Sequence, residues 1–420
     1  MTTWIIEPHD PLIVRDGRPF GPIPGARASS LAFPFPSTTT GGLRNRAGLD
    51  SRGVFDRSRI DEVKALAVRG PLLVVLNDAN EIENCLLPAP ADGLLLAPQL
   101  AASNNSQDTT TTNTVTTDAS TNEATSAIRK RLVPLALPQG AETNLPGGLA
   151  PVGLLQPDPR KPLSNPPHFW YWERYKQWLL NPELEDAVKL SELGVHGPLQ
   201  EQRTHVSIDP ASQAAREGAL FQTRGLEFTG SIRERMALAL ITDQDSPAVR
   251  AGLAPLGGER RIVDWRVSQS LRQTPPLACP IELRTAVKDS GFCRVLLLTP
   301  ACFSAGFMPA WLLRASDGSQ RTVQAVALQR PQVVSGWDFA ANGGRGSPKP
   351  TRRLAPAGTV YFLKLAGGPE IIEQWIDQIW MQCVSDDAQD RHDGFGLALI
   401  GSWDGQLHLM QQQEQTDAAN

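Results

Sequence analysis

The stretch TVYFLKLAGGPEIIEQWIDQIWMQCVSDDAQDRHDGFGLALI, residues 359–400, decides the fold. Its first seven residues are rich in β-branched and aromatic types and predict a strand. Two glycines end that strand, and Pro369 suits the first turn of a helix. Apolar residues then recur at helical spacing from Ile371 to Trp380, and residues 396–401 predict another strand. Strand, helix and strand with one apolar helix face make half of a ferredoxin-like unit.

The N-terminal half has a related pattern. Residues 4–14 predict a first strand that is interrupted at Pro8, and a helix follows Ser37. Residues 72–87 hold two apolar runs around an Asn-Asp-Ala-Asn turn, which indicates a hairpin. We therefore expect an α+β fold of two tandem ferredoxin-like (RRM-like) domains with loop and helical insertions. The expected domains are residues 1–165 and 166–420.

Two segments interrupt this pattern. Residues 103–127 consist mostly of Ser, Thr, Asn, Gln and Asp, so they bury too little apolar surface to offset the entropy of ordering. We expect a mobile loop there, without catalytic residues. Residues 168–194 predict a helical segment in which Tyr171, Tyr175 and Trp178 follow helical spacing. This spacing favours the core or a subunit interface, although aromatics interleaved with cations are also typical of surfaces that stack bases.

Composition limits the function. The chain has 420 residues and a formal net charge of −4, which argues against binding nucleic acid through bulk charge alone but permits a local basic groove. No apolar run reaches the roughly 18 residues of a membrane span, and no signal-peptide pattern opens the chain, so we expect a cytoplasmic protein. The five cysteines are scattered, and no dinucleotide or phosphate loop motif occurs. We therefore expect no disulfide framework, metal or cofactor.

Two stretches near the N-terminus combine arginines with a rigid backbone. Residues 15–21, RDGRPFG, predict a loop that carries Arg15, Gly17 and Arg18. Residues 33–46, FPFPSTTTGGLRNR, predict a Pro-rich approach to a helix that Ser37 or Thr38 caps. The open end of such a helix suits a phosphate, and its two glycines indicate close approach of another backbone. The alternative is an entry loop that caps an ordinary core helix.

Three further segments offer basic or polar groups. Gly257 and Gly258 allow a backbone nest for an anion beside Arg260, although a turn with surface arginines has the same sequence. Residues 339–369 contain five cations and no acid, as expected either for a segment that binds a nucleic-acid backbone or for a solvated loop. His205 lies in a predicted half-buried strand and could act in RNA cleavage, but a lone histidine is more often structural.

Several of these motifs resemble a known family. The N-terminal signature joins Ile6-Glu7-Pro8, Asp10-Pro11-Leu12 and residues 15–20 to Phe35-Pro36-Ser37-Thr38 and Gly42-Leu43-Arg44. Later segments follow in the same order: His205-Val206-Ser207-Ile208-Asp209, Glu217-Gly218-Ala219-Leu220-Phe221, Leu256-Gly257-Gly258-Glu259, Leu298-Thr299-Pro300, residues 356–362 and Gly394-Phe395-Gly396. Together they resemble the CRISPR-associated RAMP proteins, in particular the third-subunit family of the Cmr module in type III-B effector complexes.

The resemblance implies a function in antiviral defence. Members of this family have two RRM-like domains and no known catalysis of their own. They hold the repeat-derived 5′ tag of the CRISPR RNA, and they dock the large polymerase-like subunit and a backbone RAMP subunit, so that target RNA is met indirectly. The segments described above then supply the expected RNA-binding residues, which are Arg15, Gly17, Arg18, Ser37, Thr38, Arg44, Arg46, His205, Gly257, Gly258, Arg260, Arg345, Lys349 and Arg352.

Two other functions compete with this one. Related RAMP proteins cleave CRISPR RNA without a metal by means of a histidine, so a metal-independent endoribonuclease centred on His205 is the first alternative. The second is a scaffold protein without an RNA role, in which the Pro- and Gly-rich segments are ordinary loops.

Overall fold

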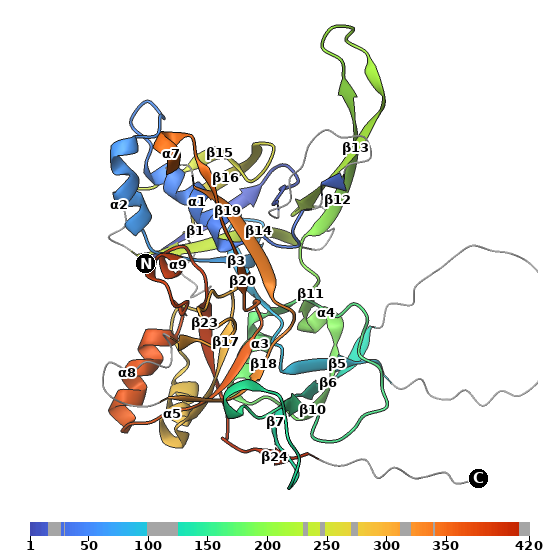
Figure 1. The fold of residues 1–420 in the computed structure, drawn as a ribbon, viewed down its shortest axis with the longest axis vertical. Helices are drawn as coiled ribbons and strands as arrows, with labels where there is room; N and C mark the ends of the chain where they lie inside the picture. The colour runs from blue at the N-terminus through green and yellow to red at the C-terminus, as the bar shows by residue number, and fades with distance from the viewer. Residues whose placement is uncertain are drawn as a thin grey trace, which may run out of the picture.

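The structure is a computed structural model that describes residues 1–15, 27–28, 30–98, 125–229, 234–243, 248–269, 276–310, 321–338 and 341–410. Most of the predicted loop at 103–127 therefore lies outside the described residues. Figure 1 shows two packed sheet regions, from which one long hairpin projects at one end.

An eight-stranded antiparallel sheet forms the first region. Its order is β11 (Gly194–Val195), β9 (Phe169–Tyr171), β4 (Ile82–Pro88), β3 (Val68–Leu76), β14 (Arg235–Thr242), β1 (Thr2–Pro8), β16 (Arg261–Val267) and β15 (Gly252–Leu256). The predicted hairpin at 72–87 is confirmed as β3 and β4. In the centre, Ile6 of β1 lies opposite Leu238 on one side and Trp265 on the other.

The expected domain border at residue 165 is wrong. Strand β1 pairs with β14 and β16, so one sheet contains both the N-terminal strand and strands up to Val267. Residues 77–234 form a long insertion between the neighbouring strands β3 and β14. The sequence pattern placed a border inside this insertion because the pairing of distant strands leaves no local signal.

A five-stranded antiparallel sheet forms the second region. Its order is β18 (Thr322–Ala327), β21 (Val360–Lys364), β17 (Phe292–Leu297), β23 (Leu397–Ser402) and β22 (Gln382–Cys383). Helices α5 (Ile281–Ser290) and α8 (Pro369–Ile379) pack on it through contacts with β17, β22 and β23. The strand, helix and strand predicted in residues 359–400 are therefore confirmed as β21, α8 and β23.

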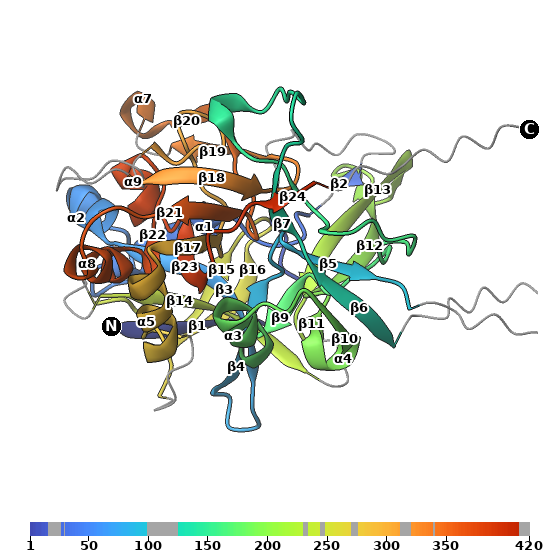
Figure 2. The same ribbon diagram turned by 90° about the horizontal axis from the view of Figure 1, so that it is seen from below.

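Smaller elements complete the described chain. Two three-stranded sheets have the orders β10 (Glu185–Lys189), β6 (Ser126–Arg131), β5 (Gly93–Leu96) and β24 (His408–Leu409), β7 (Val133–Ala136), β8 (Val152–Gly153). The projecting hairpin is β12 (Leu199–Ile208) and β13 (Ala215–Glu227), with β2 (Arg27–Ala28) beside it. A two-stranded ribbon consists of β19 (Gln332–Asp338) and β20 (Ser347–Leu354). Figure 2 shows β24 beside β7. The remaining helical elements are α1 (Pro36–Ala47), η1 (Arg57–Arg59), α2 (Ile60–Ala65), η2 (Pro146–Gly148), α3 (Trp172–Leu180), α4 (Leu190–Leu193), α7 (Ala341–Gly344) and α9 (Ala388–His392).

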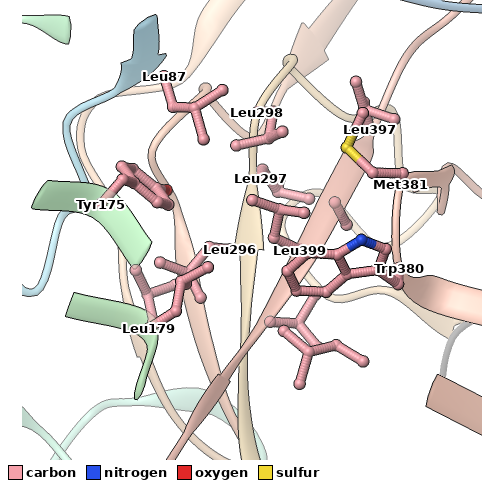
Figure 3. Close-up of a cluster of buried hydrophobic side chains, with 14 of the residues drawn as sticks. Leu87, Tyr175, Leu179, Leu296, Leu297, Leu298, Trp380, Met381, Leu397 and Leu399 are labelled. Atoms are coloured by element: carbon pink, nitrogen blue, oxygen red, sulfur yellow. The ribbon is translucent and has the colours of Figure 1, made fainter. Parts of the chain in front are cut away.

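The segment predicted as helical at 168–194 is only partly so. It consists of β9, α3, β10 and α4, because its aromatics extend the large sheet before the helix begins. Tyr175 and Trp178 are fully buried in the core, as their spacing predicted. Figure 3 shows Leu87, Tyr175 and Leu179 on one side of this core and Trp380 on the other, with Leu297 between them.

Helix α1 packs closely on the other face of the large sheet. A Cβ added to Gly42 would lie 2.7 Å from Leu256 Cδ1, so a larger residue there would push the helix away. Leu43 joins Ile6 and Trp265 in the core beneath it. The close approach expected from the glycines is therefore made by Gly42 against side chains, whereas Gly41 has nothing within 4 Å.

A buried ion pair joins the insertion to the five-stranded sheet. Arg294 of β17 is 1% exposed and pairs at 2.5 Å with Asp92, which is fully buried. Arg294 also donates to the backbone oxygens of Trp178 and Ser402, and the Trp178 indole donates to Asp92 Oδ1 at 2.9 Å. Gly401 leaves room for the guanidinium, because a Cβ there would lie 3.0 Å from Arg294 Nη2.

A second ion pair joins α1 to the five-stranded region. Arg44 Nη1 and Asp393 Oδ1 are 2.5 Å apart, and Arg44 also donates to the backbone oxygens of Leu66 and His392. Thr40 of the same helix donates to the Asp393 carbonyl at 2.8 Å. Next to this contact, a Cβ at Gly394 would lie 2.6 Å from the Gly70 carbonyl, so only glycine fits there.

We expect Arg294→Met to lower the free energy of unfolding by about 3–5 kcal/mol, because it leaves the Asp92 carboxylate buried without its cation. Chemical denaturation followed by circular dichroism measures the change. Arg52→Met is the matched control, since that side chain is 82% exposed and its ion pair with Asp50 contributes at most about 1 kcal/mol. Equal effects of the two substitutions would contradict the prediction.

Arg44→Met is expected to lower the free energy of unfolding by about 3 kcal/mol, because it leaves the Asp393 carboxylate and two carbonyl groups without their hydrogen-bond donor. Thermal unfolding should show the loss as a lower melting temperature. Arg174→Met, which removes an exposed pair with Glu192, should change it little. An Arg44 variant as stable as the Arg174 variant would show that the contact is not structural.

Candidate nucleic-acid interface

Three segments distant in sequence meet beside the root of the β12–β13 hairpin. Leu12 exchanges backbone hydrogen bonds with Leu226 of β13, each at 2.8 Å. The Gly258 amide donates to the Ile13 carbonyl at 2.7 Å, which brings the turn between β15 and β16 to the same place. We name this region the arginine surface and define it by its exposed or partly exposed cations, which are Arg15, Arg203, Arg260 and Arg261.

A shallow depression lies within the arginine surface. It is small, with a volume of about 10 Å³, and is lined by Pro11, Ile13, Glu201, Arg203, Thr223, Gly225 and Arg261. The hairpin comes close to the N-terminal segment here because Gly225 has no side chain: a Cβ would lie 2.7 Å from Pro11 Cβ. The Arg261 Nε is buried and has no hydrogen-bond partner within the described part of the chain.

The two glycines of the β15–β16 turn do not form the expected anion nest. The φ angle of Gly257 is +69°, and a Cβ there would lie 2.5 Å from the Ile13 carbonyl oxygen. The Gly258 amide is already bonded to that oxygen. The glycines thus hold the turn against the N-terminal segment, and the Gly258 amide is not free for a phosphate. A phosphate contact of Gly257 stays a prediction.

The turn presents charged side chains instead. Glu259 and Arg260 both have positive φ angles, +57° and +51°, which side-chain-bearing residues adopt rarely. Arg260 is exposed, and Glu259 forms an ion pair with Arg15, whose side chain is 42% exposed. Arg15 therefore lies beside the turn that carries Arg260. The acid that pairs with Arg15 is Glu259, the residue before Arg260.

His205 lies on the hairpin near the depression. Its ring stacks on Phe221 of the paired strand, with centroids 5.2 Å apart, and its Nε2 lies 2.9 Å from Thr223 Oγ1. The half-buried ring is thus fixed by its neighbours. This environment fits a packing role beside the depression that Thr223 lines.

Helix α1 does not supply free cations. Arg44 makes the buried pair described above, and Arg46 donates to the backbone oxygens of Arg250 and Ala251. Burial, together with the neighbouring Arg250, lowers the pKa of the Arg46 guanidinium. The prediction that Arg44 and Arg46 face RNA is therefore wrong, because both guanidinium groups are engaged by partners within the protein.

The start of α1 also differs from the expectation. Phe35 precedes the helix and Pro36 is its first residue, so neither Ser37 nor Thr38 is the cap. The Thr38 amide is already bonded to the Phe35 carbonyl at 3.0 Å. Ser37 and Thr38 are half-buried in the first turn.

The β19–β20 ribbon carries the remaining predicted cations. Arg345 and Lys349 are exposed, whereas Arg352 pairs with Asp390 and lies 5.3 Å from the Phe395 ring centre. The root of the ribbon packs against Leu31, whose amide donates to Val14, the neighbour of Arg15. The exposed cations of the ribbon are not shown to join the arginine surface. Gly17 and Arg18 lie outside the described residues.

Sequence reasoning missed Arg203 and Arg261 as members of this surface. Arg203 is two residues from His205 on one strand face, and Arg261 directly follows Arg260. Strand alternation gave a weak signal for the first, but their meeting depends on pairings between distant strands.

Other kinds of site are not found in the described ranges. Among those residues, no group of three or more His, Cys, Asp or Glu side chains is arranged to hold a metal ion. None of the described helices combines the length and apolar character needed to cross a membrane.

Comparisons with known proteins identify the family. A family model described as CRISPR-associated protein (Cas_Cmr3) matches residues 4–403. A search of curated proteins finds no match. Among solved structures, the chain resembles subunits in two structures of the type III-B Cmr-beta complex bound to cognate target RNA, one of them also bound to AMPPnP. These are 15% and 16% identical, with TM-scores of 0.41 over 86% of both chains. It also resembles a chain of a Csm3–Csm4 subcomplex from a type III-A interference complex, at 7% identity and a TM-score of 0.34, over 86% of this chain and 92% of that one. Because the family model spans nearly its whole length, the chain belongs to the Cas_Cmr3 family of CRISPR-associated proteins.

Proposed function

We propose that the chain is a non-catalytic, RNA-binding subunit of a type III-B CRISPR effector complex. It binds the repeat-derived 5′ tag of the CRISPR RNA, docks the large polymerase-like subunit and contacts a backbone RAMP subunit. Family membership supports the place in CRISPR defence. The arginine surface is the observation that carries RNA binding.

The chemistry of the arginine surface suits an unpaired strand. A guanidinium can donate two parallel hydrogen bonds to a phosphate. Arg203 and Arg261 line the shallow depression, and Arg15 and Arg260 belong to the neighbouring N-terminal segment and β15–β16 turn. A shallow site reaches phosphates and the Watson–Crick edges of splayed bases, and those edges are accessible only where the RNA is unpaired.

We also propose that the fold contains two ferredoxin-like units. The strands β3-β14-β1-β16 and the strands β18-β21-β17-β23 have the same order when each set is numbered along the chain, namely second, third, first and fourth. Helix α1 follows the first strand of one unit, and α8 precedes the last strand of the other. The first unit then extends to Val267 and contains the insertion.

Reversing the charge of Arg15 and Arg260 together should reduce binding of a tag-containing RNA at least tenfold, because each lost contact to a charged group contributes about 1.5–3 kcal/mol. Retention of CRISPR RNA by the purified effector complex and filter binding by the full chain measure the change. Arg52→Glu is the control, an exposed charge outside the arginine surface. Unchanged retention, or absence of RNA from the native complex, would favour the scaffold alternative.

Incubation of the chain with repeat RNA should give no defined product, because His205 is fixed between Phe221 and Thr223 rather than placed beside a second acid or base. Gel analysis of labelled RNA tests this. A defined product that disappears in His205→Ala would support the endoribonuclease alternative instead.

A further inference from the structure

Two cations of the arginine surface are each held by a carboxylate. Arg15 pairs with Glu259, and Arg203 Nε lies 2.5 Å from Glu201 Oε1. All four side chains are at least 36% exposed, so solvent and ligands reach them. Exposed pairs of this kind contribute little to stability, so a ligand can break them at small cost.

The backbone aims Glu259 at Arg15. The contact of Gly257 with the Ile13 carbonyl and the Gly258 hydrogen bond fix the turn two residues from Arg15. Glu259 itself has a φ of +57°, an unfavourable conformation for a residue with a side chain, which persists only where the surroundings impose it. Glu201 has a simpler cause, because residues two apart on a strand share one face.

One of the arginines that line the depression has a donor without an acceptor. The Arg261 Nε is buried and unpaired within the described residues, and the Arg203 and Arg261 side chains line the same space. A buried N–H group normally finds an acceptor, so this donor points to an anionic or polar group that binds here.

We propose that Glu259 and Glu201 are specificity-determining residues that hold the place of RNA phosphates. This inference rests on the proposed function. A carboxylate and a phosphate present similar paired oxygens to a guanidinium. In the free protein the carboxylates occupy Arg15 and Arg203, and a bound strand displaces them while its next phosphate or base edge reaches Arg261.

The consequence is discrimination between strands. Displacing two carboxylates opposes every RNA equally, but only a strand that also fills the depression offsets that loss. The pairs also halve the charge of the surface, from four cations to a net of two, which weakens non-specific attraction. Glu201 and Glu259 therefore suppress binding of arbitrary RNA more than binding of the tag.

The test uses the full chain and its Glu201→Gln/Glu259→Gln double variant. Fluorescence anisotropy measures the affinity for a labelled RNA with the repeat-derived tag and for oligouridine of equal length. We expect the variant to bind oligouridine about tenfold more tightly and the tag less than threefold more tightly, so that the preference for the tag falls. Glu142→Gln, in an exposed loop away from the surface, should behave like the wild type.

The outcomes separate the two proposals. Wild-type preference for the tag together with unchanged oligouridine binding by the double variant overturns the place-holder role and leaves the proposed function intact. Weaker binding of both RNAs by a variant with an unchanged melting temperature also overturns it, because the carboxylates would then contact RNA favourably. A wild-type chain that shows no preference for the tag counts against the proposed function itself.

Discussion

The buried contact between Arg294 and Asp92 is the constraint on which the structure depends. Neither group is exposed, so each needs the other, and the guanidinium also binds backbone oxygens from α3 and β23. One side chain thus fixes the loop before β5, helix α3 and two strands of the five-stranded sheet. The insertion between β3 and β14 is therefore held against the second sheet, and the β12–β13 hairpin that it contains leaves the molecule from a fixed base.

The fold could be predicted from the sequence where its elements are local. Strand β21, helix α8 and strand β23 lie within 43 residues and have clear hydrophobic periodicities, so the sequence predicted their types and their order correctly. Strands β3 and β14 pair although the whole insertion separates them in sequence, and the residues near either strand contain no pattern that predicts this pairing. The domain border failed for this reason, and the helical segment at 168–194 was overextended because its aromatics suit a sheet edge as well as a helix.

In the candidate site, the sequence likewise could not predict which charged side chains are on the surface. The sequence identifies an arginine but not its partner. Arg44 and Arg46 follow a Pro-rich loop and look exposed, yet close packing at Gly42 places both inside the protein. Arg15 and Arg260 have the same local character but are on the surface. Arg260 lies in the β15–β16 turn, and Arg15 pairs with Ser30 in an isolated β-bridge, so neither lies on a packed helix. Only the strand pairings show that Arg203 and Arg261 join them.

The strand β24 has a practical consequence. It pairs with β7 at the end of the molecule opposite the β12–β13 hairpin (Figure 1). A fluorophore or purification handle attached on the C-terminal side of β24 therefore starts far from the arginine surface and leaves access to it open. Strand β1, in contrast, lies between two partners in the large sheet.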